Sequence, residues 1–218
     1  MLLLPESWRS FASLEAGFGD RASRPPDETT RVHQVHGNAV ISCDELAPGE
    51  HRDIGADALV ATIPGILVAV KTADCVPILV FAPPVPHRER WVAAVHAGWR
   101  GAVADVAGAA VADAVRRDHA ADTLLAAIGP AIGPCCYEVD EDVAAQFRRA
   151  GLPTIDELHK PHLDLRAINR ELLVRAGMRP ENIEVCGPCT RCRSDLYHSF
   201  RACPSEGGRQ QNWIGWTD

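Results

Sequence analysis

Three histidines and an adjacent Asp-Cys pair stand in otherwise apolar stretches of this 218-residue chain. VHQVHG contains His33 and His36, TADC contains Asp74 and Cys75, and AAVHAGWRG contains His96. Zinc binds imidazole nitrogen and thiolate sulfur, and a catalytic zinc site uses three protein ligands beside an open position. His36, Cys75 and His96 would supply two nitrogens and one sulfur. Because they lie far apart in the chain, such a site requires three separate elements to converge.

The same residues are compatible with two other interpretations. Cys75 as a nucleophile, with His96 as base and Asp74 or His36 as the orienting group, would make a cysteine hydrolase. Cys75 as a small buried hydrophobe and His96 as a hydrogen-bonded core histidine would involve no chemistry at all. The spacing alone favours the last interpretation and does not separate the other two.

The GWRG sequence after His96 indicates an anion site. Arg100 and two glycines stand where a strand is expected to turn into a helix, and the free amides of a helix start attract anions. Arginine can also hold a phosphate with two hydrogen bonds. The alternative is that Trp99 packs in the core and Arg100 is a surface charge. Its position beside the candidate metal ligand His96 favours the anion site.

A second group of thiols lies late in the chain, with Cys186, Cys189 and Cys192 in CGPCTRC and then Cys203. The spacing resembles an iron–sulfur or structural zinc site, and CGPC resembles a thioredoxin-type redox pair. A non-catalytic redox or metal-binding module is therefore one functional hypothesis. However, Pro188 and the flanking charges predict a loop, and Cys135–Cys136 would form a vicinal disulfide only with strain. We expect buried or loop thiols, with a structural metal as the alternative.

The elements that must position these residues are short β-branched runs and Ala-rich or amphipathic segments. Strands are predicted over residues 57–62, 66–72, 76–82, 91–97, 123–130, 182–186 and 211–216, with a strand or hairpin edge in 31–43. Helices are predicted over residues 98–117, 138–150 and 164–177; the last two have acids early and arginines late, as the helix dipole favours.

These elements predict a single α/β domain over residues 1–218, of mixed α+β character, in which mixed β-sheets are covered by helices in a layered, sandwich-like arrangement. The hydrophobic periodicity of residues 1–30 is weak, and residues 21–30 have the composition of a loop. We expect residues 1–30 to be a weakly ordered or atypical N-terminal segment. The strand order is left open.

Composition and charge exclude several classes of partner. The chain is 46% hydrophobic and 23% charged, and 22 basic against 29 acidic side chains give a net charge of -7. This charge disfavours nucleic acid and anionic membranes as partners. The apolar start MLLL is too short for a signal peptide, and no apolar stretch approaches a membrane span. We expect a cytoplasmic protein whose eight cysteines are reduced thiols or metal ligands.

The order of the motifs resembles the laccase-domain family, from about His33 to the C-terminus. The segments that carry the resemblance are VHQVHG, DALVAT, KTADCVPILV, AAVHAGWRG, GPAIGPCCYEV, DLRAINRELL, CTRCRSDLYHSFRA and GRQQNWIG. TADC followed by VHAGWRG is specific to that family. Its members were long labelled multicopper polyphenol oxidases and are described as purine nucleoside phosphorylases with adenosine deaminase activity.

The resemblance implies zinc at His36, Cys75 and His96, whereas His33 has no counterpart. It implies that adenosine, inosine or S-methyl-5'-thioadenosine reacts with phosphate, and that adenosine is also deaminated. Deamination needs an acid that carries a proton, for which Asp74 is our candidate; Asp74 would otherwise hold a ligand histidine in its tautomer. Arg100 is the candidate for phosphate.

Two departures from the family pattern stand out. The segment before VHQVHG is shorter than in most members, which bears on nucleoside specificity, and the PPVPHRER loop lengthens the link between Cys75 and His96. Copper and phenol oxidation are the alternative to zinc, but laccase-type copper sites need many histidines in close pairs and this chain has nine scattered ones. The sequence leaves monomer and homodimer open.

Overall fold

The central element of the fold is a six-stranded sheet with the strand order β10-β9-β7-β8-β5-β3. This computed structural model describes residues 2–156 and 159–218. The strands of this sheet are β3 (Val40–Ser42), β5 (Ala58–Ala61), β7 (Val76–Phe81), β8 (Val92–Ala97), β9 (Leu125–Ile128) and β10 (Ile183–Val185). The four inner strands pair antiparallel, and β3 and β10 pair parallel at the two edges, so the sheet is mixed.

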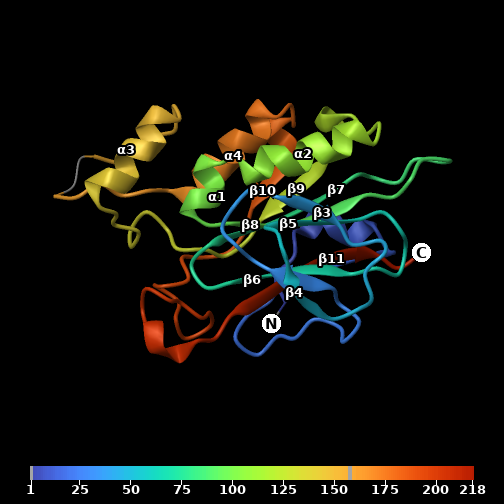
Figure 1. The fold of residues 1–218 in the computed structure, drawn as a ribbon, viewed down its shortest axis with the longest axis horizontal. Helices are drawn as coiled ribbons and strands as arrows, with labels where there is room; N and C mark the ends of the chain where they lie inside the picture. Colours follow the sequence, from blue (N-terminus) through green and yellow to red (C-terminus); the bar gives the residue numbers. More distant parts are fainter. Residues whose placement is uncertain (1, 157–158) are drawn as a thin grey trace.

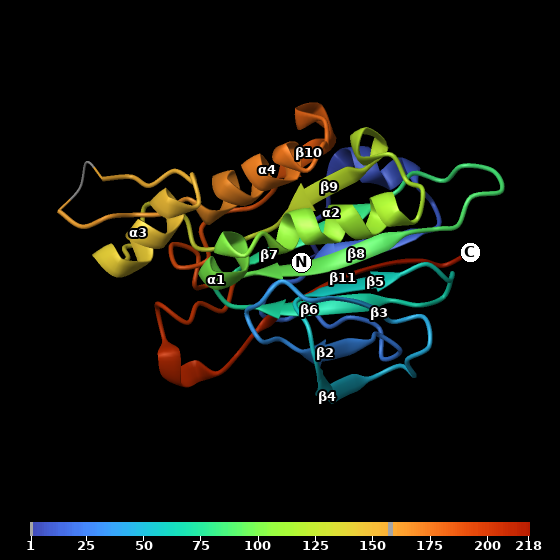
Figure 2. The same cartoon turned by 45° about the horizontal axis from the view of Figure 1, so that its top comes forward.

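A second, three-stranded antiparallel sheet lies against one face of the first (Figures 1 and 2). Its strands, in the order β1-β11-β6, are β1 (Leu14–Phe18), β11 (Gln210–Trp216) and β6 (Val68–Thr72). A short parallel pair, β2 (Arg31–His33) and β4 (Glu50–Gly55), lies beyond β6.

The helices lie on the opposite face of the six-stranded sheet (Figure 1). They are α1 (Trp99–Val103), α2 (Val106–Arg116), α3 (Glu141–Arg149) and α4 (Leu165–Arg175), with 3-10 turns at Glu6–Ser10, Ala121–Thr123, Pro180–Asn182 and Pro204–Glu206. The helices α1, α2 and α4 cover the sheet, and α3 lies at one end. Among the described residues, no helix is long and apolar enough to cross a membrane.

Both faces of the central strands are buried, which explains their uninterrupted apolar sequences. Along β7, Ile78 and Val80 pack under the helices, whereas Leu79 and Phe81 pack against the three-stranded sheet. Side chains alternate between the two faces of a strand, so a strand buried on both sides is apolar at every position. The predicted single α/β domain, with mixed sheets covered by helices in layers, is confirmed.

The predicted helix over residues 98–117 is instead two helices. Asp105 separates α1 from α2 and has a left-handed backbone conformation, with φ of 57°. Its side chain accepts a hydrogen bond from the amide of Gly108 and thereby caps α2. Aspartate tolerates the left-handed region better than most residues, so a new helix begins here without a glycine.

The sequence analysis gave no prediction for two of the strands. In the N-terminal segment, β1 pairs along its whole length with β11 from the far end of the chain. Phe18, the last residue of β1, and Trp8 are buried in the same core cluster. The strand β4 is mostly polar and pairs with β2. Local periodicity is weak in both segments: β1 is short and its partner lies at the far end of the chain, and β4 is mostly exposed and polar, so no apolar pattern marks it.

The strand register delivers two candidate ligands to one edge of the sheet stack. Pro77 of β7 lies opposite His96 of β8, so Cys75, which directly precedes β7, lies beside the end of β8. His96 has the same parity as Val92 and Ala94, which face the three-stranded sheet. The side chain of His96 therefore points into the space between the two sheets.

Candidate metal centre and substrate pocket

The structure brings His36, Cys75 and His96 together. The candidate ligand atoms of these three residues all lie within 4.8 Å of one another. The imidazole rings of His36 and His96 meet edge to face, with their centroids 4.8 Å apart. The three residues come from the loop after β2, the turn between β6 and β7, and the end of β8. His33 lies on β2 in the wall of the adjoining pocket and is not part of this group.

The loop that carries His36 is held by a buried carboxylate. Asp57 is fully buried and accepts hydrogen bonds from the backbone amides of Val35 (3.2 Å), His36 (3.0 Å) and Gly37 (2.7 Å). His36 has a φ of 61°, in the left-handed region that non-glycine residues seldom adopt. The three amide contacts with Asp57 offset the cost of this backbone conformation and fix the direction of the His36 side chain.

Asp57 also orients the second histidine. The Nδ1 atom of His96 lies 2.8 Å from Oδ1 of Asp57. When Nδ1 carries the proton and donates a hydrogen bond to this carboxylate, the lone pair of Nε2 is available to a metal. One buried carboxylate thus positions two of the three candidate ligands. The sequence analysis did not select Asp57; the only signal was an acidic residue at the start of the apolar ALVA strand.

The Asp74 carboxylate, which the sequence analysis considered for the histidine-holding position, has other partners. It accepts hydrogen bonds from the Thr190 hydroxyl (2.7 Å) and from the backbone amide of Arg201 (2.6 Å). These bonds connect the turn between β6 and β7 to the C-terminal loop. Asp74 lines the pocket next to Cys75, where the sequence analysis expected a proton carrier.

Gly98 allows the three ligands to approach one another. A Cβ atom at this position would lie 3.0 Å from Cδ2 of His36 and 3.1 Å from Sγ of Cys75. Both distances are shorter than ordinary van der Waals contacts, so a larger residue would displace one ligand or the other. This contact accounts for the first glycine of the GWRG motif.

Electrostatics at the site favour the charged forms of the sulfur and of one histidine. Burial raises the pKa of Cys75, but hydrogen bonds from His36 and His96 outweigh it and lower the value to about 6. Burial lowers the pKa of His96, but contacts with Asp57 and Cys75 raise it to about 9. Thiolate is the form of cysteine that binds metals, and a metal would displace the proton from Nε2 of His96 when it binds. Two imidazoles and one thiolate, with fewer than four protein ligands, make a donor set that suits catalytic zinc.

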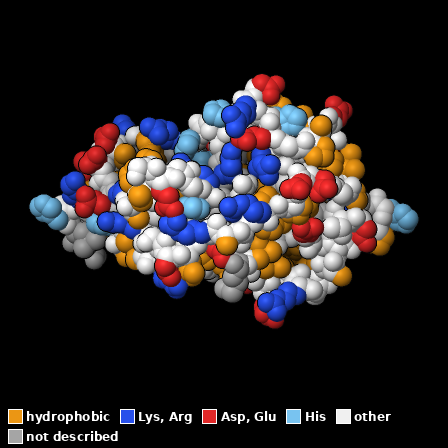
Figure 3. Space-filling view, turned by 90° about the horizontal axis from the view of Figure 1, so that it is seen from below, with side chains coloured by type: hydrophobic (Ala, Val, Ile, Leu, Met, Phe, Trp, Pro, Cys, Tyr) orange, Lys and Arg blue, Asp and Glu red, His pale blue; other side chains and the backbone are white. Residues whose placement is uncertain are grey.

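A pocket of about 720 Å³ opens over these three residues. This volume lies in the range of small-molecule sites. Its wall contains four basic side chains, Lys71, Arg100, Arg201 and Arg209, and three large aromatic ones, Trp99, Tyr137 and Phe200. In Figure 3, Lys and Arg side chains gather near the middle of one face of the molecule, although the net charge of the chain is -7. The pocket therefore combines surfaces for an anion and for a flat ring.

Two of the pocket residues are placed for distinct contacts. Arg100 lies in the first turn of α1, and its guanidinium carbon is 4.3 Å from the centroid of the Trp99 ring. Phe200 is 54% exposed although it is a large aromatic residue. An exposed aromatic ring at a pocket is a surface on which a planar ligand can stack.

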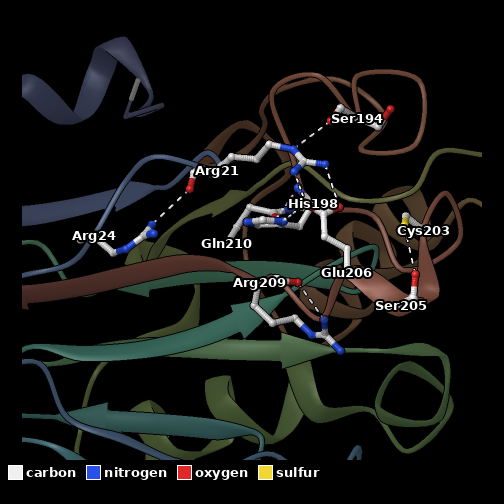
Figure 4. A network of polar contacts seen from close by, with 10 residues as sticks. Arg21, Arg24, Ser194, His198, Cys203, Ser205, Glu206, Arg209 and Gln210 are labelled. Atoms are coloured by element: carbon white, nitrogen blue, oxygen red, sulfur yellow. Dashed lines mark hydrogen bonds and ion pairs between the residues drawn. The ribbon is translucent and has the colours of Figure 1, made fainter.

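A network of polar contacts holds the C-terminal loop that forms one wall of the pocket (Figure 4). Arg21, from the N-terminal segment, forms an ion pair with Glu206 and donates a hydrogen bond to the carbonyl of Ser194 (2.9 Å). Gln210, at the start of β11, accepts a hydrogen bond from the amide of His198 (2.8 Å). Residues 194–209 thus depend on contacts with Arg21 of the N-terminal segment and with Gln210 of β11.

Comparison with known proteins gives a family match over most of the chain. The family model described as multi-copper polyphenol oxidoreductase laccase matches residues 15–217. A relative named adenosine deaminase RL5, from an unknown prokaryotic organism, is 39% identical over 195 residues, which are 84% of this chain and 73% of the relative. The purine nucleoside phosphorylase of Deinococcus radiodurans is 38% identical over 206 residues, which are 94% of this chain and 75% of the relative.

Solved structures share the fold. The hypothetical protein YfiH of Bacillus licheniformis has a TM-score of 0.86 at 27% identity, covering 99% of this chain and 96% of that one. YlmD of Geobacillus stearothermophilus has a TM-score of 0.80 at 29% identity, covering 95% and 93%.

Replacing Asp57 with asparagine should weaken metal binding. Asp57→Asn keeps the side-chain size but replaces one carboxylate oxygen with an amide NH₂ group. Because NH₂ cannot accept the hydrogen bonds that the carboxylate oxygen accepts, His36 and His96 should lose their orientation. We expect the affinity for Zn²⁺ to fall about 10–100-fold, as for other residues that orient metal ligands. Competition with a chromophoric chelator measures it. Asp44→Asn is the matched control, since Asp44 accepts bonds from Thr62 away from the site; equal affinities for the wild type and Asp57→Asn would contradict this role.

The low pKa of Cys75 predicts how its reactivity depends on pH. Only thiolate is alkylated, so in chelator-treated protein the iodoacetamide rate at Cys75 should rise through about pH 6 and level off above, rather than rise near the usual pKa of 9.0. Peptide-resolved mass spectrometry follows each cysteine. Cys43, whose pKa burial raises to about 12, is an internal control that should stay unmodified at neutral pH. A Cys75 rate that climbs only in alkaline solution would rule out the thiolate–imidazolium pair.

Proposed function

We infer the function of this chain from its family: it belongs to the family described as multi-copper polyphenol oxidoreductase laccase. The resemblance indicated by TADC and VHAGWRG is thereby confirmed. We propose that the chain is a zinc-dependent purine nucleoside phosphorylase that also deaminates adenosine. The observation that carries the proposal is the convergence of His36, Cys75 and His96 in a pocket lined by basic and aromatic side chains. The proposed substrates are adenosine, inosine and S-methyl-5'-thioadenosine, with phosphate as the second substrate.

His36, Cys75 and His96 are the residues that would hold zinc. The donor set fits the ion, because two imidazoles and a thiolate meet within 4.8 Å and Asp57 fixes the histidines. When bound, zinc supplies Lewis-acid chemistry, which can activate water or polarise a substrate oxygen.

The other pocket residues would bind and orient the substrates. Arg100 would bind phosphate through its guanidinium and hold it toward the ribose. Phe200 and Tyr137 offer ring faces to a purine base. Stacking holds a base through its ring face and does not require a hydrogen bond to each ring atom. This suits a site that accepts more than one nucleoside.

Asp74 is our candidate for moving a proton during deamination. The leaving amino group must be protonated, and the Asp74 carboxylate lines the pocket beside Cys75. Hydrogen bonds from Thr190 and from the Arg201 amide keep this carboxylate in place. A carboxyl group fixed in this way keeps a constant position beside the pocket, and general acid catalysis requires a proton donor within hydrogen-bond reach of the leaving group.

Phenol oxidation is the second candidate, and the description of the family as a polyphenol oxidoreductase favours it. Within the described ranges 2–156 and 159–218, two groups of three or more candidate ligands occur, and only one of them contains histidine. Laccase-type chemistry uses several copper ions with many imidazole ligands. We therefore rank nucleoside chemistry first, and copper-dependent turnover of a phenol would reverse that ranking.

The first test combines metal content with nucleoside turnover. The purified protein should contain zinc and convert adenosine to adenine only when phosphate is present, and to inosine without it; chromatography separates these products. His96→Ala and Cys75→Ser should reduce both reactions to background because each removes a metal ligand. His87→Asn, an exposed histidine in the PPVPHRER loop, is the control. If the metal-free protein retains turnover that Cys75→Ser abolishes, the cysteine-hydrolase mechanism holds instead.

The role of Arg100 has its own signature. Arg100→Ala should raise KM for phosphate about 10–100-fold in phosphorolysis, since hydrogen bonds to charged groups are worth about 1.5–3 kcal/mol. Deamination of adenosine, which uses no phosphate, should change little. Steady-state kinetics of both reactions separates the two effects. Arg100→Lys should restore part of the phosphate affinity, and Arg116→Ala, whose side chain pairs with Asp113 on α2, should change neither reaction. Equal losses in both reactions would contradict a phosphate-binding role.

A further inference from the structure

Four cysteines from two distant segments meet outside the candidate active site. The Sγ atoms of Cys135, Cys136, Cys189 and Cys192 all lie within 4.8 Å of one another. The first two belong to the GPCCYEV turn that follows β9, and the last two to the CTRC segment that follows β10. An isolated parallel bridge between Ala131 and Cys189 brings the two segments together. We call these four residues the thiol cluster.

The distances within the thiol cluster suit a metal better than a disulfide. Sγ of Cys192 lies 3.6 Å from that of Cys135 and 3.5 Å from that of Cys136. Zinc–sulfur bonds of about 2.3 Å in a tetrahedron place sulfur atoms about 3.8 Å apart. A disulfide requires about 2.05 Å between two sulfurs and leaves the other two thiols unused.

Backbone amides around one sulfur of the cluster, that of Cys189, favour its anionic form. The N–H of Gly133 donates to Sγ of Cys189 over 3.2 Å, and the amides of Arg191 and Cys192 also donate to this sulfur. Cys189 is buried, so its sulfur receives these donors in place of water. Amide groups directed at a ligand sulfur are the usual outer partners of a metal-bound thiolate.

The cluster lies at the junction of two loops that build the substrate pocket. Cys136 directly precedes the pocket residue Tyr137, and Cys189 directly precedes Thr190. Thr190 is fully buried and donates its hydroxyl hydrogen bond to Asp74, the neighbour of Cys75. The two segments are joined by the bridge between Ala131 and Cys189, and a metal held by the thiol cluster would join them by direct bonds as well.

We propose that the thiol cluster is a second metal site, which binds one zinc ion in a structural role distinct from that of His36, Cys75 and His96. Four thiolates close the coordination shell of zinc and leave no position for a substrate, so this site holds the protein together and does no chemistry itself. Its ligands span the two loops, so the ion would fix the pocket residue Tyr137 and, through Thr190, the pocket residue Asp74.

The primary test counts zinc in full-length protein that has been purified under reducing conditions, loaded with ZnCl₂ and desalted. Elemental analysis should give about two zinc ions per wild-type chain, one at His36, Cys75 and His96 and one in the thiol cluster. His36→Ala/His96→Ala should retain the ion of the cluster, and Cys135→Ser/Cys192→Ser, which changes the two exposed ligands, should retain the other. Cys186→Ser and Cys203→Ser, outside the cluster, are matched controls that should keep both ions.

A second measurement uses the wild-type protein, so it does not depend on whether a variant folds. Zinc-loaded protein should protect the four cluster cysteines, but not Cys203, from alkylation, and a chelator should remove that protection. In the His36→Ala/His96→Ala background, Co²⁺ should give the intense charge-transfer absorption of a tetrathiolate. One zinc per wild-type chain with the four thiols freely alkylated, a disulfide in the reduced preparation, or iron with acid-labile sulfide would each overturn the proposal. None of these results depends on nucleoside turnover, so the proposed function is tested separately.

Discussion

The candidate site depends above all on the buried carboxylate of Asp57. Its oxygens bind Nδ1 of His96 and three consecutive amides of the loop that carries His36. A buried carboxylate without partners would cost several kcal/mol, so these contacts are needed for folding as well as for orienting the histidines. The hydrogen bonds that compensate for the burial of the Asp57 carboxylate thereby also set the directions of the His36 and His96 imidazoles, which come from different parts of the chain. The same requirement explains why His36 retains a left-handed backbone conformation.

The layered fold explains why the site lies where it does. The helices and the three-stranded sheet bury both faces of β5, β7 and β8, which leaves no space for a ligand along the middle of these strands. The pocket opens at the edge where β7 begins and β8 ends, and there the polar residues Asp74, Cys75 and His96 replace the apolar pattern. Loops from three regions, around residues 34, 137 and 200, close over this edge. The pocket is therefore a property of strand ends and loops on a rigid support.

The two groups of candidate metal ligands that contain cysteine suit different kinds of metal site. His36, Cys75 and His96 provide three ligands beneath an open pocket, which suits an ion that meets substrate. The thiol cluster provides four sulfurs between two loops, which suits an ion that does not. Thr190 connects the groups, since it follows Cys189 and binds Asp74 beside Cys75. A change in the cluster would therefore reach the pocket through one buried hydrogen bond.

The sequence by itself predicted the helical regions and most strands of the central sheet, because the spacing of apolar residues is a local property. Ligand chemistry made His36, Cys75 and His96 candidates, but it was the resemblance of the surrounding motifs to a known family that selected them as one site. The sequence did not identify β1, whose partner β11 lies at the far end of the chain, or β4, whose sequence is mostly polar. It did not indicate Asp57 either, because an acidic residue before an apolar strand acquires its meaning only when two other segments donate to it. Cys135 and Cys136 likewise showed no link to Cys189 and Cys192. Tertiary structure decided each of these, because they depend on contacts whose partners are brought together only when the sheets form.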